Sequence, residues 1–146
     1  MKTKIWIVLF IATVIFSCNK DKYTTKPQLT LKSVSSTSVI QNENLRFEIE
    51  FTDKEGDVID TLYLETVSKL TNCSAADKPI SKFDYPIPSF SATKNQKGIF
   101  EINFRVGTDF QGCRNRNDTL TFRFCLKDKA KNLSDTLISP AIAIAR

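Results

Sequence analysis

Hydrophobic and polar residues alternate with a period of two along much of the chain. In the stretch LRFEIEF (45–51) every second residue is hydrophobic and the residues between are charged. The stretches FEINFRV (100–106) and LTFRFCL (120–126) repeat the alternation. Successive side chains of an extended strand point to opposite faces, so these stretches predict half-buried β-strands. The phenylalanines on the hydrophobic side are expected in the core: Phe47, Phe104, Phe122 and Phe124.

This pattern, with turn residues between the runs, predicts seven strands, and no stretch after residue 26 has a helical period. The fourth strand runs into YPIP (85–88), and proline cannot donate a ladder hydrogen bond, so we expect an extended loop or a strand at a sheet edge here. In the last strand Ile138, Ile142 and Ile144 share one parity and hence one face. The predicted strands cover residues 27–36, 44–52, 59–68, 80–86, 98–106, 118–127 and 134–145.

Strands with one hydrophobic and one polar face favour antiparallel sheets packed face to face. Seven short strands are typical of a single immunoglobulin-like β-sandwich, so the predicted fold class is all-β. The turns FTDKEGD (51–57) and KDKAKNLS (127–134) resemble turns of immunoglobulin-like domains in Bacteroidetes lipoproteins. The sequence lacks the antibody-type hallmarks of this fold, a core tryptophan on the third strand and a tyrosine two places before Cys125, so it fits the fibronectin-III, cadherin or PKD-like relatives. The resemblance implies no particular activity, because this fold hosts many functions.

The N-terminal segment has a different character. Lys2 and Lys4 precede an uncharged run, 5–16, which is followed by Ser17 and Cys18. This order is typical of a cleaved signal peptide, and the run is shorter than the roughly twenty residues that span a bilayer. The Ser-Cys pair resembles the lipobox of Bacteroidetes-type lipoproteins, which implies cleavage before Cys18 and lipidation of its side chain.

The chain therefore divides into a signal peptide (1–17), a lipid-anchored flexible tether (18–26) and a sandwich domain (27–146). The tether is polar and has no apolar period, which is typical of a disordered spacer. The lipid would hold the domain in the cell envelope at the outer membrane, facing either the periplasm or the cell exterior.

Composition restricts the chemistry. The chain has no histidine, which removes the commonest general base and a common transition-metal ligand. No G-x-S-x-G elbow is present either, so we expect no enzymatic activity. The formal net charge of +5 includes the lysines of the signal peptide and is too small to indicate a nucleic-acid partner.

One acidic turn could hold a cation. Asp53, Glu55 and Asp57 alternate around a glycine, and carboxylate oxygens at this spacing suit Ca²⁺. The loops after the second and sixth strands lie at the same end of such a sandwich, so Asp128 and Asn132 could add further oxygens. The alternative is a polar hairpin turn in which these residues serve turn geometry alone, with no cofactor.

Export favours disulfide formation, and three cysteines remain once Cys18 is lipidated. Cys73 and Cys113 lie in connections that open at the same end of the predicted sandwich. Cys125 lies toward the other end of its strand, roughly 20 Å away at about 3.3 Å per residue, and on the outward face. We therefore predict the Cys73–Cys113 disulfide with Cys125 free; the alternative is three reduced thiols.

The tripeptide Asp-Thr-Leu occurs three times, each time at the start of a predicted strand. It matches the short O-glycosylation motif of exported Bacteroidetes proteins, which would make Thr61, Thr119 and Thr136 acceptors. The alternative is structural: Asp closes a turn, Thr favours strands and Leu points inward.

These observations predict a lipid-anchored, non-enzymatic module of the cell envelope that binds an unknown protein or glycan or has a structural role. One alternative is a periplasmic inhibitor or immunity lipoprotein that blocks a single partner. Another is an accessory glycan-binding protein, which would need exposed aromatic side chains. The candidates for that role are Tyr63, Phe83, Tyr85 and Phe90.

Overall fold

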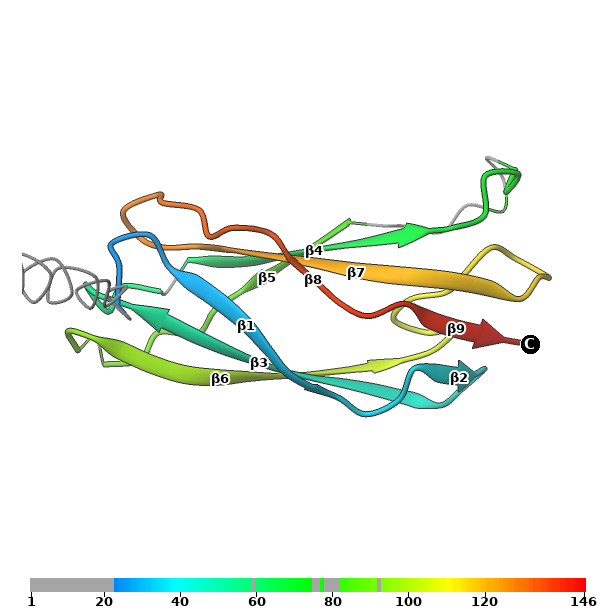
Figure 1. Ribbon diagram of the computed structural model, residues 1–146, viewed down its shortest axis with the longest axis horizontal. Coiled ribbons are helices and arrows are strands. Elements are labelled where there is room, and N and C mark those ends of the chain that lie inside the picture. Colours follow the sequence, from blue (N-terminus) through cyan, green and yellow to red (C-terminus); the bar gives the residue numbers. More distant parts are fainter. Residues whose placement is uncertain (1–22, 59, 75–76, 78–81, 92) are drawn as a thin grey trace, which may run out of the picture.

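The computed structural model describes residues 23–146 except 59, 75–76, 78–81 and 92. The described part is all-β and consists of two sheets packed face to face (Figure 1). No helix in the described residues is long and apolar enough to cross a membrane. The strands are β1 (Gln28–Val34), β2 (Ser38–Ile40), β3 (Asn44–Asp53), β4 (Thr61–Ser68), β5 (Lys82–Pro86), β6 (Gln96–Arg105), β7 (Asp118–Lys127), β8 (Leu137–Ile138) and β9 (Ile142–Ala145).

The sheet topology confirms an immunoglobulin-like sandwich. One sheet has the order β1-β3-β6, and the other has the order β2-β9-β7-β4-β5 with β8 also paired to β7. All pairs are antiparallel except β2 with β9. The predicted fourth strand is β5, which pairs only with β4 among the described strands and is therefore an edge strand, as expected.

The four phenylalanines expected in the core are all buried. Phe47 from β3 lies between the sheets, with its ring centroid 4.9 Å from that of Phe122 and 5.3 Å from that of Phe124 on β7. Phe104 on β6 completes the cluster, 6.1 Å from Phe47. The two-residue periodicity of β3, β6 and β7 is thus sufficient to identify the side chains that join the two sheets.

The prediction of a single strand over residues 134–145 is wrong. It is divided into β8 and β9, and Ile138 is 56% exposed whereas Ile142 and Ile144 are buried. Between the two strands, Ser139 is buried and its hydroxyl accepts a hydrogen bond from the Phe122 N–H at 2.9 Å. Pro140 follows and has no N–H to continue the ladder, so the parity changes at this point. Strand β2 was also missed, because three residues are too few to show a period.

The predicted disulfide is confirmed. Cys73 and Cys113 are bonded, with their Cα atoms 5.8 Å apart, and Cys125 is free and half-buried. The bond joins the connection after β4 to the connection after β6. Both connections lie at the end of the sandwich that also carries the C-terminus, and the loops after β3 and β7 lie at the opposite end (Figure 1).

Candidate metal centre

The acidic turn begins at the last residue of β3. Alternation along this strand turns Asp53 inward, on the same side as Phe51, and its side chain is fully buried. The chain then curls around this carboxylate: Asp53 Oδ2 accepts hydrogen bonds from the N–H groups of Gly56 at 2.6 Å and Asp57 at 3.3 Å. Asp57 is thereby held beside Asp53.

Gly56 makes this curl possible. Its φ of 76° lies in the left-handed region that favours glycine. A Cβ at this position would also lie only 2.0 Å from the carbonyl oxygen of Thr93. The turn therefore packs directly against the segment that precedes β6, and no larger residue fits there.

The second acidic loop follows β7. Asp128 is fully buried, and its two carboxylate oxygens accept hydrogen bonds from the backbone N–H of Asn132 at 2.7 Å and from its side-chain Nδ2 at 2.8 Å. The N–H of Lys129 donates to the carbonyl oxygen of Asp57 at 2.9 Å. This bond joins the two loops, which confirms that they lie at the same end of the sandwich.

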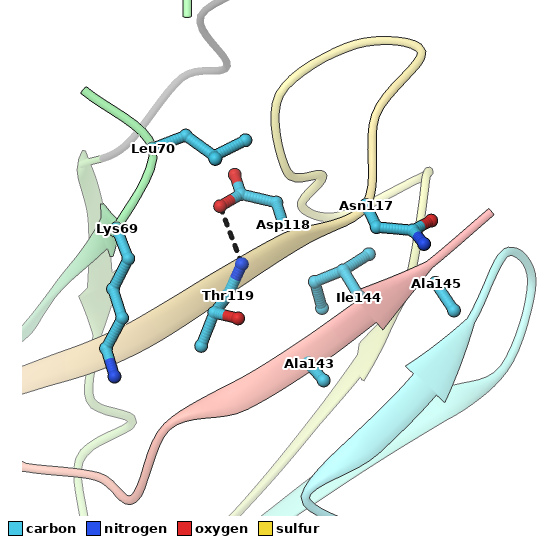
Figure 2. Close-up of a pocket in the computed structure, with 8 residues that line it drawn as sticks. All are labelled: Lys69, Leu70, Asn117, Asp118, Thr119, Ala143, Ile144 and Ala145. Carbon is cyan, nitrogen blue, oxygen red and sulfur yellow. Dashed lines mark hydrogen bonds between the residues drawn. The ribbon is translucent and has the colours of Figure 1, made fainter. Parts of the chain in front are cut away.

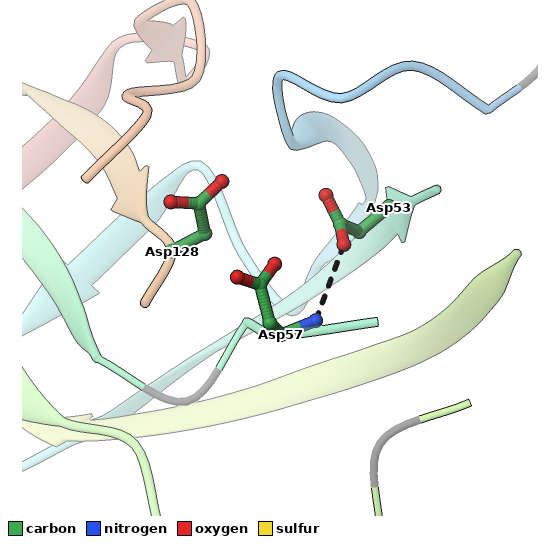
Figure 3. A group of neighbouring side chains, drawn as sticks. All are labelled: Asp53, Asp57 and Asp128. Atoms are coloured by element: carbon green, nitrogen blue, oxygen red, sulfur yellow. Dashed lines mark hydrogen bonds between the residues drawn. The ribbon is translucent and has the colours of Figure 1, made fainter. Parts of the chain in front are cut away.

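Three carboxylates meet between these loops. One oxygen from each of Asp53, Asp57 and Asp128 lies within 4.8 Å of the others, and Figure 3 shows the three side chains facing a common space. Asp53 Oδ1 and Asp57 Oδ1 are buried and have no hydrogen-bond partner in the protein. Among the ion pairs of the described residues, none includes these three aspartates.

The electrostatics of the cluster are unfavourable without a cation. Burial raises the pKa of the Asp53 carboxyl above its ordinary value of 3.8. The N–H groups of Gly56 and Asp57 oppose this shift, and the negative charges of Asp57 and Glu55 add to it. Like-charged carboxylates that share a buried site favour binding of a proton or a cation.

Two lysines close to Asp128 in the chain pair with a different carboxylate. Lys127 Nζ lies 3.3 Å from Asp60 Oδ1, and Lys131 Nζ lies 2.9 Å from Asp60 Oδ2. The pKa of Asp60 is lowered to about 2, mainly by the hydrogen bonds that Lys131 and Thr61 donate to its carboxylate. These lysines are therefore paired beside the cluster rather than within it.

Two of the predicted ligands have other roles. Glu55 is exposed, lies outside the carboxylate cluster and accepts a hydrogen bond from the Thr25 hydroxyl at 3.1 Å. It follows the inward-facing end of β3, where the turn no longer keeps the strand's alternation. Asn132 donates hydrogen bonds to both oxygens of Asp128 and so orients that carboxylate.

Sequence reasoning missed Gln96, the first residue of β6. It is paired with Asp53 in the β3–β6 ladder, and its Oε1 is buried without a hydrogen-bond partner in the protein. An inward-facing amide at a strand end was the only signal in the sequence. Its relation to Asp53 depends on a strand register between residues far apart in the chain.

The opposite end of the sandwich has a hollow of about 250 Å³ beside Asp118 (Figure 2). Both carboxylate oxygens of Asp118 accept hydrogen bonds, which distinguishes this site from the acidic cluster. Asp118 accepts hydrogen bonds from the Ser68 hydroxyl, the Cys113 N–H and the Thr119 N–H at 2.8, 2.9 and 2.6 Å. We therefore regard Asp118 as a structural residue that holds the disulfide-bonded connection against β7.

The three Asp-Thr-Leu sequences do lie at strand starts. Thr61 is the first residue of β4 and its hydroxyl donates to Asp60 at 2.7 Å, whereas Thr119 is the second residue of β7. Thr136 immediately precedes β8 and is the exposed member of the three. The structural role of the motif is thus visible at Asp60 and Asp118, and glycosylation stays a prediction.

The aromatic candidates for glycan binding are mostly engaged in packing. Phe83 and Tyr85 are half-buried on the inner face of β5 and pack against the core. Tyr63 is also half-buried, with Lys127 Nζ 5.4 Å from its ring centroid. Phe90 is 37% exposed. These residues do not form a flat, exposed aromatic platform.

Comparisons with known proteins add information on the fold alone. No family model matches the chain, and no curated protein does. The sporulation control protein Spo0M from Bacillus subtilis is similar in structure, with a TM-score of 0.50 and 8% sequence identity over 84% of this chain. The match covers 51% of Spo0M, so this chain spans about half of that protein's length. A Niemann-Pick type C2 protein from the Japanese carpenter ant has a TM-score of 0.43 and 11% identity, covering 81% of this chain and 89% of its own.

Proposed function

We propose that this chain is a lipid-anchored, non-enzymatic module of the cell envelope that binds Ca²⁺ between the loops after β3 and β7. One observation carries the metal-binding part: Asp53, Asp57 and Asp128 converge, and buried oxygens of the first two have no partner in the protein. A cation between the carboxylates would satisfy both oxygens and remove the repulsion among the three charges.

The chemistry of the site favours calcium. All three side chains offer oxygen, the ligand type of hard cations, and the chain has no histidine for a softer metal. Ca²⁺ accepts about 6–8 oxygens in a flexible geometry, whereas Mg²⁺ requires a near-ideal octahedron. Ligands from two separate loops suit the more tolerant ion, with water completing its coordination.

The position of the site also supports a role near the membrane. Thr24 accepts a hydrogen bond from the Lys54 N–H at 3.2 Å, so the N-terminal segment lies on the acidic turn. Tyr23 follows Cys18 by five residues, which span roughly 18 Å when fully extended. A lipid on Cys18 would therefore hold the calcium-binding end close to the membrane and present the disulfide end to a protein or glycan partner.

Thermal unfolding tests the calcium site. The full-length protein, purified in detergent, should melt about 5–10 °C higher at a hundredfold excess of Ca²⁺ over its dissociation constant than in chelator. Exported modules often bind only at about 0.1–1 mM, so the titration must reach several millimolar. Asp57→Asn should lose the shift, because it removes one of the three negative charges that meet at the site.

Asp84→Asn is the matched control, because Asp84 is an exposed carboxylate on β5 outside the cluster. This variant should keep the full shift. The proposal is wrong if the wild-type protein melts at the same temperature in several millimolar Ca²⁺ and in chelator.

The anchor has its own test. Cys18→Ala should abolish lipidation, and the variant should accumulate as unprocessed precursor instead of fractionating as mature protein with the outer membrane. Mass spectrometry of the N-terminal peptide distinguishes the two forms. A mature wild-type protein without acyl groups on Cys18 would contradict the lipoprotein assignment and leave the calcium site unaffected.

A further inference from the structure

Gln96 lies directly opposite Asp53 in the antiparallel ladder of β3 and β6. Side chains of directly opposed residues project from the same face, with Cβ atoms roughly 4.5–5.5 Å apart. The neighbouring pair on this face, Phe51 with Gly98, is part of the inner layer. Gln96 and Asp53 therefore both point into the space between the sheets at the acidic end.

Buried side-chain oxygens without a partner are concentrated at this end. In the described part of the chain there are three such atoms: Asp53 Oδ1, Asp57 Oδ1 and Gln96 Oε1. An amide oxygen removed from water without a hydrogen-bond donor destabilises the folded state. A single shared ligand at one place accounts for all three atoms, because each of them is an acceptor.

Gln96 is held firmly beside the acidic turn. The N–H of Asn95, its neighbour, donates to the carbonyl oxygen of Lys54 at 2.8 Å. Gly56 packs on the backbone of Thr93 so closely that no side chain would fit between them. The start of β6 and the turn after β3 are therefore one packed unit, so the backbone that carries Gln96 is held beside the acidic turn.

We propose that Gln96 is a further protein ligand of the calcium ion and supplies a neutral amide oxygen beside the three carboxylates. This inference rests on the proposed function. Side-chain amides are ordinary calcium ligands. The ligand set then comes from both sheets, β3 and β6 on one side and the end of β7 on the other, so that the ion joins the sheets at this end. A neutral ligand adds an oxygen to the coordination without adding a fourth negative charge.

Calcium titrations of full-length variants test this role. Gln96→Met keeps a similar side-chain length and removes the oxygen, so calcium binding should weaken at least tenfold. The metal-free melting temperature should stay the same or rise, because a buried amide oxygen without a hydrogen-bond partner has been removed. Gln96→Glu should bind calcium more tightly and should melt at a lower temperature in chelator, because a fourth carboxylate joins the cluster.

Asn103→Met is the control on the same strand, because Asn103 is exposed on the outer face of β6, and calcium affinity should be unchanged. If the wild type binds calcium and Gln96→Met binds equally well, Gln96 is not a ligand and the proposed function stands. If Gln96→Met binds weakly and also melts lower in chelator, its role is structural and the inference is wrong. Absence of binding by the wild type would instead contradict the proposed function itself.

Discussion

Asp53 and Asp118 are buried at opposite ends of the sandwich, and the two carboxylates differ in their partners. Asp118, beside the disulfide, accepts hydrogen bonds at both oxygens from the Ser68 hydroxyl and from two backbone N–H groups. Asp53, at the other end, has two backbone donors on one oxygen and none on the second.

The charges and donors around the two aspartates differ as well. Asp118 lies between a hydroxyl and N–H donors, which together stabilise its negative charge. Asp53 faces two further carboxylates, Asp57 and Asp128. The comparison shows that a buried aspartate alone does not indicate a metal site. A metal site is indicated by a buried acceptor that lacks a hydrogen-bond donor and lies among like charges, and in the described residues this condition holds at the acidic end only.

Removing the disulfide should have the largest effect. The bond closes a loop with a sequence separation of 40 residues, for which the chain-entropy model gives about 4 kcal/mol. Cys73→Ala together with Cys113→Ala should lower the free energy of unfolding in urea by about this amount. The loss should be equal in chelator and in calcium, because the bond and the acidic cluster are at opposite ends. A loss that depends on calcium would contradict the independence of the two ends.

The same substitution at the two aspartates should act in opposite directions. Asp118→Asn loses the charge and one acceptor of a buried network and should destabilise the domain by about 2–3 kcal/mol. Asp53→Asn in chelator removes a repelled charge and keeps an oxygen for the Gly56 N–H, and its new amide can donate to Asp57 or Asp128. It should stabilise the metal-free domain by about 1 kcal/mol. Urea denaturation in chelator measures both, and equal losses would invalidate the distinction.

The smallest expected effect is a pH dependence. Because burial raises the pKa of Asp53 above 3.8, the folded state binds this proton more tightly than the unfolded state does. The contribution of the Asp53 carboxyl to the free energy of unfolding is fully present below pH 3.8. It is lost as the pH rises through the raised pKa that this group has in the folded state. In chelator, wild type should therefore lose stability relative to Asp53→Asn as the pH rises above 3.8.

The stabilities of wild type and Asp53→Asn should be compared above pH 3.8, because the protonation of Asp60 also changes stability at lower pH. Its pKa is lowered to about 2, so its contribution is present above 3.8 and is lost as the pH falls toward 2. Urea midpoints at several pH values measure the difference between wild type and Asp53→Asn. Parallel profiles for the two proteins would show that Asp53 does not have a raised pKa.

The sequence was informative wherever a local pattern determines the structure. Alternation located β3, β6 and β7, and strand order with the distance along one strand was enough to pair Cys73 with Cys113. It also placed Asp53 and Asp128 at the same end, because both follow strands that run in the same direction. These inferences need only a period, a topology and a distance along a strand.

The errors arise where the structure depends on pairing or on a single turn. Glu55 has the correct spacing for a ligand, but the turn around Gly56 leaves it exposed. Gln96 was missed because its proximity to Asp53 is a matter of register between two strands. The break between β8 and β9 depends on Ser139 taking an inward position before Pro140, which the spacing of the isoleucines does not indicate.

Isothermal titration of the full-length protein with CaCl₂, in a buffer freed of metal, is the most direct test of the account. Wild type and Asp84→Asn should each bind one Ca²⁺ per chain, and Asp53→Asn should bind none at the same concentrations. Binding with unchanged affinity in Asp53→Asn, or no binding by wild type at several millimolar calcium, would contradict the assignment of the acidic end as a calcium site.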